Sequence, residues 1–208
     1  MNGTAKFIST ILTIFVIGFI FRVEIRDFIY FDLVTSDMFV TADSDNFDPG
    51  LRVGSTFPAI SARYKGEVIT EIDQFKKQKG VILIASRSYD WCPYCMKQLI
   101  QLQQYKAQFE RAGIGLVAIT YDSQEQQQAF TDKHSISIPV LSDIEASSFT
   151  ALDILHADYP KEDEHYGLPY PGMFVVENNG VIKGKLFVET YSSRVDAEST
   201  LVLARSVL

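Results

Sequence analysis

Two continuous apolar runs, separated by a helical pattern, constrain the fold of this chain most strongly. The runs are VILIAS at 81–86 and GLVAIT at 115–120. Strands of this kind are buried on both faces, as in parallel sheets that are covered by helices. Between the runs, Leu99, Leu102 and Tyr105 recur at helical spacing. The pattern therefore predicts a strand, a helix and a second strand parallel to the first.

The flanking segments extend this unit into an α/β domain. Asn179-Gly180 lies between two apolar runs and predicts a hairpin over 172–189. Asp122 and Ser123 are both suitable N-caps for a following polar helix. The expected fold is a mixed sheet flanked by helices, with the hairpin strands antiparallel to each other. Further expected elements are two short strands within 55–70, a short helix at 71–79, a short strand within 136–143, and helices at 144–155 and 195–208.

Both cysteines of the chain stand in the sequence CPYC, where the first apolar run gives way to the helix. Cys92 would lie at the helix N-terminus, whose partial positive charge favours a thiolate. Pro93 suits the first helical position, and Cys95 follows one turn later on the same face. The arrangement predicts a redox pair in which Cys92 attacks and Cys95 resolves the resulting intermediate. We expect Pro93 and Tyr94 to tune the pair, and Trp91 to form an apolar lid beside it.

Other uses of two cysteines remain open at this point. They could be ordinary buried thiols, or part of a metal site. A zinc site needs two further ligands, and no two of His134, His156 and His165 have the spacing of paired ligands. We therefore predict no metal and no organic cofactor.

The charge of the chain argues against nucleic acid as a partner. The net charge is −7, the sequence pI is about 5.0, and the basic residues are scattered. A groove that tracks a phosphate backbone needs clustered basic residues. The expected partners are instead disulfides or thiols and an electron-donor protein.

The amino-terminal segment is a candidate membrane anchor. Residues 7–21 are mostly apolar and are flanked by Lys6 and Arg22. This run is short for a spanning helix of about 17–25 residues, although the flanking cations could snorkel. No small-residue cleavage site follows closely, so we favour an uncleaved anchor over a cleaved signal or a buried core helix. The expected division is an anchor and juxtamembrane segment at 1–42, a linker at 43–50 and the α/β domain at 51–208. We expect the domain to be exported to the periplasmic side.

These motifs together resemble the thioredoxin-like superfamily, and within it the redoxin branch that contains the alkyl hydroperoxide reductase/thiol-specific antioxidant (AhpC/TSA) group. The similar segments are LRVGSTFPAI, DWCPYC, AITYDSQEQQQAFTDKHSISIPVLSD and YPGMFVVENNGVI, across roughly residues 51–190. The resemblance implies a thioredoxin-like fold. It also assigns a cis-proline to Pro171, with the backbone of Tyr170 beside it pairing with substrate in a groove. Pro169 is the competing candidate for this role, and both prolines could instead be ordinary turn residues.

The sequence departs from the family patterns around the cysteines. Peroxiredoxins place Thr or Ser three residues before the reactive cysteine, where this chain has Tyr89. They also carry an arginine ahead of the late strand that PGMF does not supply, although Arg87 lies near the motif. Related reductases keep an acid where this chain has Ser86 or Gln98, which leaves water or Asp90 for proton transfer.

The resemblance and the CPYC pair predict a thiol-disulfide oxidoreductase with roles in redox homeostasis. A peroxiredoxin-like thiol peroxidase is the alternative, in which Cys95 captures a sulfenic acid formed on Cys92. A copper-handling or non-catalytic module is the third interpretation.

Overall fold

The computed structural model describes residues 31–43 and 46–208. The chain divides into two units between Asp37 and Met38. In the first unit, residues 31–34 are helical. The candidate anchor at 7–21 lies outside the described residues, so the anchor stays a prediction. Within the described ranges, no helix has the length and apolar character needed to cross a bilayer.

The second unit is built on a mixed sheet with strand order β3-β2-β6-β5-β4-β7-β8. As predicted, β4 and β5 are parallel, and β7 and β8 form an antiparallel hairpin around Asn179-Gly180. β6 extends the parallel part, whereas β7 runs antiparallel to β4. The strands are β2 (Ala62–Tyr64), β3 (Glu67–Ile69), β4 (Gly80–Ala85), β5 (Ile114–Thr120), β6 (Val140–Asp143), β7 (Gly172–Glu177) and β8 (Ile182–Phe187).

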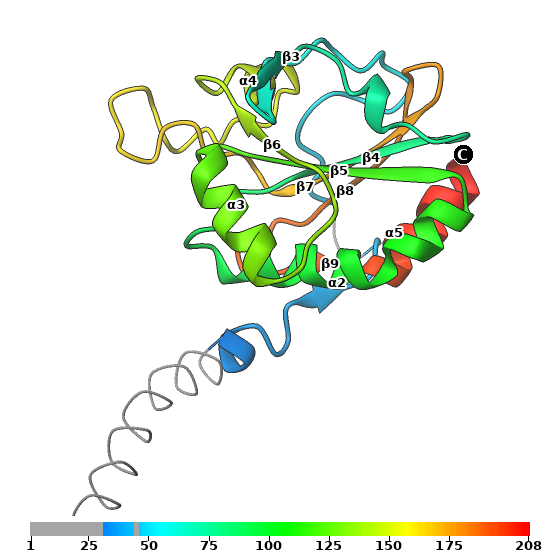
Figure 1. Ribbon diagram of the computed structural model, residues 1–208, viewed down its shortest axis with the longest axis horizontal. Helices are drawn as coiled ribbons and strands as arrows, with labels where there is room; N and C mark the ends of the chain where they lie inside the picture. The colour runs from blue at the N-terminus through cyan, green and yellow to red at the C-terminus, as the bar shows by residue number, and fades with distance from the viewer. Residues whose placement is uncertain (1–30, 44–45) are drawn as a thin grey trace, which may run out of the picture. The chain divides into compact units, whose positions relative to one another are not determined.

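Helices cover both faces of this sheet (Figure 1). The long helices α2 (Pro93–Arg111), α3 (Gln124–Lys133) and α5 (Ala197–Val207) lie on one side. The short helix α4 (Ser147–Ala151) lies on the other, with the 3₁₀ turn η1 (Asp73–Phe75). Ser123 caps α3 through a reciprocal capping box with Gln126, as its position in the sequence indicates.

Alternating residues of the central strands divide the core into two clusters. Ile82 and Ile84 of β4 belong to the cluster under α2, α3 and α5, which also contains both cysteines. Val81 and Leu83 belong to a second cluster on the opposite face. Successive side chains of a strand point to opposite faces, so a continuous apolar run supplies both clusters.

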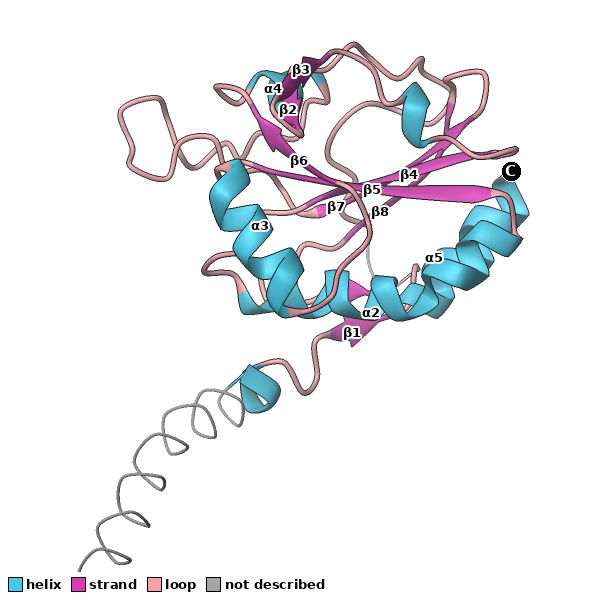
Figure 2. Cartoon of the chain, viewed as in Figure 1, coloured by secondary structure: helices cyan, strands magenta, loops and turns pink. Residues whose placement is uncertain are grey.

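Several boundaries differ from the sequence-based expectation, and the helix expected at 144–155 is confined to α4 (Ser147–Ala151). The segment 71–79 forms only the single turn η1, because a polar stretch this short has little apolar face to bury. The compact unit begins at Met38 rather than near Leu51, because β1 (Phe39–Val40) pairs in parallel with β9 (Arg194–Val195). β1 lies on the helical side of the sheet that carries α2 and α5 (Figure 2).

Candidate active site

Both cysteines lie where the sequence places them, at the start of α2. Cys92 is the N-cap residue, and its Sγ accepts a hydrogen bond from the Cys95 N–H at 3.3 Å. Pro93 begins the helix, where the missing N–H costs nothing. Both residues are free thiols and both are 0% exposed. The two thiols are therefore adjacent and enclosed.

Hydrogen bonds fix the loop that leads from β4 to Cys92. The buried Ser88 Oγ accepts the N–H groups of Asp90 and Trp91, at 2.9 and 3.2 Å. The Asp122 carboxylate accepts the Tyr89 N–H at 2.6 Å and the Thr120 hydroxyl at 3.0 Å. The path into the helix N-terminus is thus held from within the loop and from the end of β5.

A buried arginine contacts both sulfurs, and the sequence-based reasoning missed it. Arg194 Nη2 lies 3.3 Å from Cys95 Sγ and 3.8 Å from Cys92 Sγ, and the side chain is 1% exposed. Arg194 stands far from the cysteines in sequence and belongs to no motif. The only available signal was a lone arginine just ahead of the closing helix.

A second buried arginine shares a backbone partner with the first. Arg87 Nη2 and Arg194 Nη1 both donate to the Tyr191 carbonyl, at 2.8 and 3.0 Å. The Arg87 guanidinium also lies 3.6 Å from the centre of the Tyr191 ring. Two cations therefore converge on Tyr191, in the loop at 188–193 between β8 and β9.

These charges divide the protons of the thiol pair unequally. Burial alone would raise the pKa of Cys95, but the hydrogen bond from Cys92 and the charges of Arg194 and Arg87 lower that pKa well below its usual value. The pKa of Cys92 is raised, because Cys92 donates its proton to Cys95 and because it is buried. The pair thus favours one thiolate and one shared proton. A proton shift from Cys92 to Cys95 would place that charge on Cys92.

Aromatic residues neighbour the cysteines along the chain and in space. Trp91 is 40% exposed, and its indole N–H donates to the Tyr121 hydroxyl at 2.8 Å. Tyr94 meets the Tyr191 ring edge to face at a centroid distance of 6.0 Å. Trp91, Pro93 and Tyr94 therefore lie beside the cysteines, and their part in binding a substrate stays a prediction.

The prediction for Tyr170 and Pro171 needs correction. The described part of the chain contains no cis peptide bond, so Pro171 is not the expected cis-proline. The Tyr170 N–H donates to the Ile154 carbonyl at 2.7 Å and is not free for a substrate chain. Its ring packs against Phe47 and His156, in the cluster on the opposite face from the cysteines. The backbone at 169–170 therefore pairs with the segment at 154–155 of the same chain, where pairing with a substrate was expected.

The other residues considered at the sequence level have local partners. Tyr89, in place of the expected Thr or Ser, is buried and donates its hydroxyl hydrogen to Ser86 Oγ at 3.0 Å. Asp90 is exposed and accepts a hydrogen bond from Gln126 at 3.1 Å. Gln98 is buried on α2 and donates to the Val195 carbonyl at 3.2 Å.

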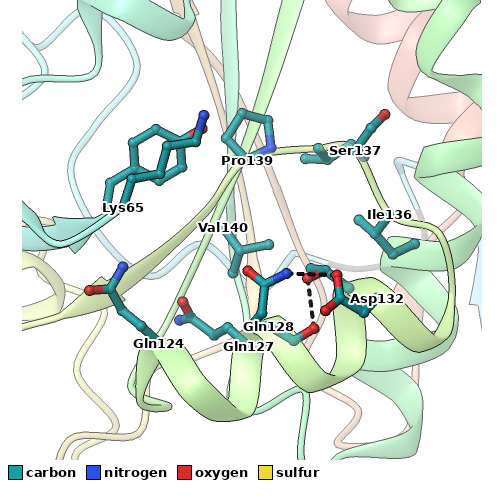
Figure 3. A pocket seen from close by; sticks show the side chains of 12 residues that line it. Lys65, Gln124, Gln127, Gln128, Asp132, Ile136, Ser137, Pro139 and Val140 are labelled. Atoms are coloured by element: carbon teal, nitrogen blue, oxygen red, sulfur yellow. Dashed lines mark hydrogen bonds between the residues drawn. The ribbon is translucent and has the colours of Figure 1, made fainter.

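A polar groove of about 310 Å³ lies elsewhere, between α3 and the segment around Lys65 (Figure 3). Its walls carry the amide side chains of Gln124, Gln127 and Gln128, and neither cysteine lines it. Gln128 donates to Asp132 at 2.6 Å across one turn of the helix. The groove therefore has no direct part in thiol chemistry.

Comparison with known proteins identifies the family of this chain. The model of the AhpC/TSA family matches residues 53–185, which include both cysteines. The chain belongs to the AhpC/TSA family. The match confirms the resemblance seen in the sequence, and it ends before β9 and Arg194.

Individual relatives of this AhpC/TSA protein are distant. It is 23% identical to the 1-Cys peroxiredoxin PER1 of Hordeum vulgare, over 65% of this chain and 63% of that protein. It is also 23% identical to a peroxiredoxin of Aeropyrum pernix, over 65% of this chain and 54% of that one. The chain thus spans less than two thirds of either relative.

Solved structures confirm the thioredoxin-like α/β fold. Peroxidoxin BcpB of Mycobacterium tuberculosis superposes with a TM-score of 0.66 at 16% identity, over 76% of this chain and 99% of that one. At this identity the likeness speaks for the fold alone.

Proposed function

We propose that this AhpC/TSA protein is a thiol peroxidase in which Cys92 attacks the peroxide and Cys95 resolves the product. The observation that carries the proposal is the enclosed thiol pair with Arg194 against both sulfurs. A guanidinium and a helix N-terminus together stabilise a thiolate and the negative charge that develops on a departing oxygen.

The burial of Cys92 favours a small oxidant. Its 0% exposure means that any substrate must reach the sulfur through movement of the surrounding side chains. A hydroperoxide needs only a narrow opening, whereas a protein disulfide must bring two bonded sulfurs and their backbone to the attacking atom. The geometry thus supports the peroxidase over the disulfide reductase favoured by the sequence alone.

The proposed cycle balances with a dithiol reductant. The Cys92 thiolate attacks one peroxide oxygen, the O–O bond breaks, and a sulfenic acid and an alkoxide or hydroxide result. The Cys95 thiol then displaces water from the sulfenic acid and forms a Cys92–Cys95 disulfide. A dithiol of a donor protein supplies two electrons and two protons and is itself oxidised to a disulfide.

Thiol-disulfide oxidoreduction is the second candidate, and the CPYC pair itself favours it. Two cysteines one helical turn apart can cycle between dithiol and disulfide without peroxide, provided that the entrance opens. The aromatic residues Trp91 and Tyr94 would then contact the partner.

Peroxide consumption by three forms of the protein separates these candidates. We expect Cys92→Ser to abolish consumption, and Cys95→Ser to consume one equivalent and stop as a sulfenic acid detectable by mass spectrometry. Wild type should continue to turn over with a dithiol reductant. Rapid reduction of insulin or of a glutathione mixed disulfide, with Cys92 left unmodified by peroxide, would support the second candidate instead.

We also propose that the chain is held at a membrane by its amino-terminal segment, with the redox domain outside the cytoplasm. The apolar run at 7–21 supports this location. Accessibility of an engineered tag at the C-terminus to protease in intact and opened cells tests the orientation, and extraction by alkaline carbonate tests the attachment.

A further inference from the structure

The position of Arg194 depends on the chain's first strand. β9 is only two residues long, and its register pairs Arg194 with Phe39 and Val195 with Val40 of β1. The Arg194 N–H donates to the Met38 carbonyl at 2.8 Å, and the Asp196 N–H donates to the Val40 carbonyl at 3.0 Å. Two backbone hydrogen bonds, one from Arg194 itself and one from Asp196, therefore hold β9 against β1 and the residue before it.

The opposite side of β9 is attached to the helix that carries the cysteines. Gln98 donates to the Val195 carbonyl at 3.2 Å, and Gln101 accepts the Ala197 N–H at 2.8 Å. β9 thus lies between α2 and β1. If β1 leaves, β9 loses its backbone partner strand, while the side-chain bonds to α2 and the bond from Arg194 to the Tyr191 carbonyl remain.

Burial ties β1 to the environment of the thiol pair. Met38 and Val195 are each 2% exposed. Val40 and Ala42 pack against the cluster that contains both cysteines. Charges interact more strongly where water is excluded, so β1 also preserves the strength of the interaction between the guanidinium and the sulfurs.

We propose that β1 is a positioning element for Arg194, and that through Arg194 it sets the ionisation of the Cys92–Cys95 pair. Both β1 and β9 lie outside the segment matched by the family, 53–185, so the device belongs to this chain's flanking segments. The inference deepens the proposed function, because it concerns the reactive thiols of that same site. The strand that follows the amino-terminal segment would then control the chemistry of a pair far along the chain.

The test compares two proline variants of the full-length chain. Val40→Pro places in β1 a residue that has no N–H and restricted backbone angles, and so should release the strand. Asp43→Pro is the matched control, at an exposed position beyond β1. The readout is the thiolate absorbance of the reduced protein as a function of pH, together with NMR of isotope-labelled cysteine.

We expect Val40→Pro to raise the first apparent pKa of the pair by about one unit or more, a tenfold loss of thiolate at pH values below it. Asp43→Pro should match wild type. Arg194→Met should reproduce the shift, and the combination Val40→Pro/Arg194→Met should shift no further than Arg194→Met alone, because both act through one group.

Further variants and outcomes keep the inference falsifiable. Should Val40→Pro fail to fold, Met38→Ala removes a buried side chain of the same segment and should shift the titration in the same direction. A folded Val40→Pro that titrates like wild type, or a shift that adds fully to that of Arg194→Met, would overturn the positioning role. A titration shift in a protein that consumes no peroxide would leave the positioning role standing and reject the peroxidase. Peroxide turnover by a wild-type protein, together with a Val40→Pro variant whose thiol titration is unchanged, would support the peroxidase and reject the positioning role.

Discussion

Arg194 is the single side chain with the most direct control over the thiol pair. Its guanidinium lies against both sulfurs and is among the causes that lower the pKa of Cys95. We expect Arg194→Met to slow reaction with peroxide at neutral pH by about tenfold or more, since one pKa unit changes the thiolate fraction tenfold below the pKa. Stopped-flow kinetics measured across pH should show the profile displaced to higher pH. Arg194→Lys keeps the charge and should recover part of the loss, and equal rates in Arg194→Met and wild type would contradict this role.

Ser88 is a second residue beside the site, and it holds the loop before Cys92 in place through hydrogen bonds. Its hydroxyl is fully buried and accepts two backbone N–H groups on the approach to Cys92. Ser88→Ala should lower the free energy of unfolding by about 0.5–1.5 kcal/mol, because it removes the acceptor of two partly buried backbone N–H groups. Urea denaturation measures the loss. Ser206→Ala, at an exposed hydroxyl that bonds only within α5, is the control and should change the free energy far less.

Single residues also show how far the sequence could be read. Cys92 as N-cap and Pro93 at the start of the helix were predictable, because capping rules act over a few neighbouring residues. Arg194 was not, because its contact with the cysteines is created by the fold and not by spacing. The predicted cis-proline at Pro171 was wrong, since a family pattern was carried over to a segment whose backbone pairs elsewhere.

At the scale of elements, predictability follows the length of the pattern. β4, β5 and the β7–β8 hairpin were visible because apolar runs and an Asn-Gly turn are strong local signals. β1 and β9 were missed because two-residue strands have no periodicity to detect, and because their pairing joins distant parts of the chain. The elements that build the scaffold were thus readable, whereas those that place Arg194 were not.

Gln98 provides a prediction for how α2 holds β9. Its amide donates to the Val195 carbonyl in a fully enclosed place, where a carboxylate cannot donate in its ionised form. Gln98→Glu should therefore lower the free energy of unfolding by about 1–3 kcal/mol and raise the first pKa of the thiol pair, as β9 and Arg194 shift. Gln101→Glu is the matched control one turn later, because Gln101 accepts the Ala197 N–H through an oxygen that glutamate retains. Identical urea and pH titrations for the two variants would refute the distinction.

For the whole molecule, the protonation of the thiol pair makes the free energy of unfolding depend on pH. The Cys95 pKa is lowered by folding, so the unfolded chain binds more protons there, and the resulting stability is full above the unfolded pKa of about 8.5 and is lost as pH falls through the folded value. The Cys92 pKa is raised, so its contribution is full below about pH 8.5 and is lost as pH rises. Together these opposite pH dependences predict that the contribution of the pair to the free energy of unfolding is greatest near the ordinary thiol pKa.

The measurement is the difference in unfolding free energy between reduced wild type and Cys92→Ser/Cys95→Ser across pH. Taking the difference cancels the titration of groups that both proteins share, and the double variant prevents one remaining thiol from assuming the charge of the pair. The difference should rise with pH up to about 8.5 and fall beyond it. A flat difference would mean that the buried arginines do not bias the pair, and the electrostatic basis of the proposed peroxidase would be lost with it.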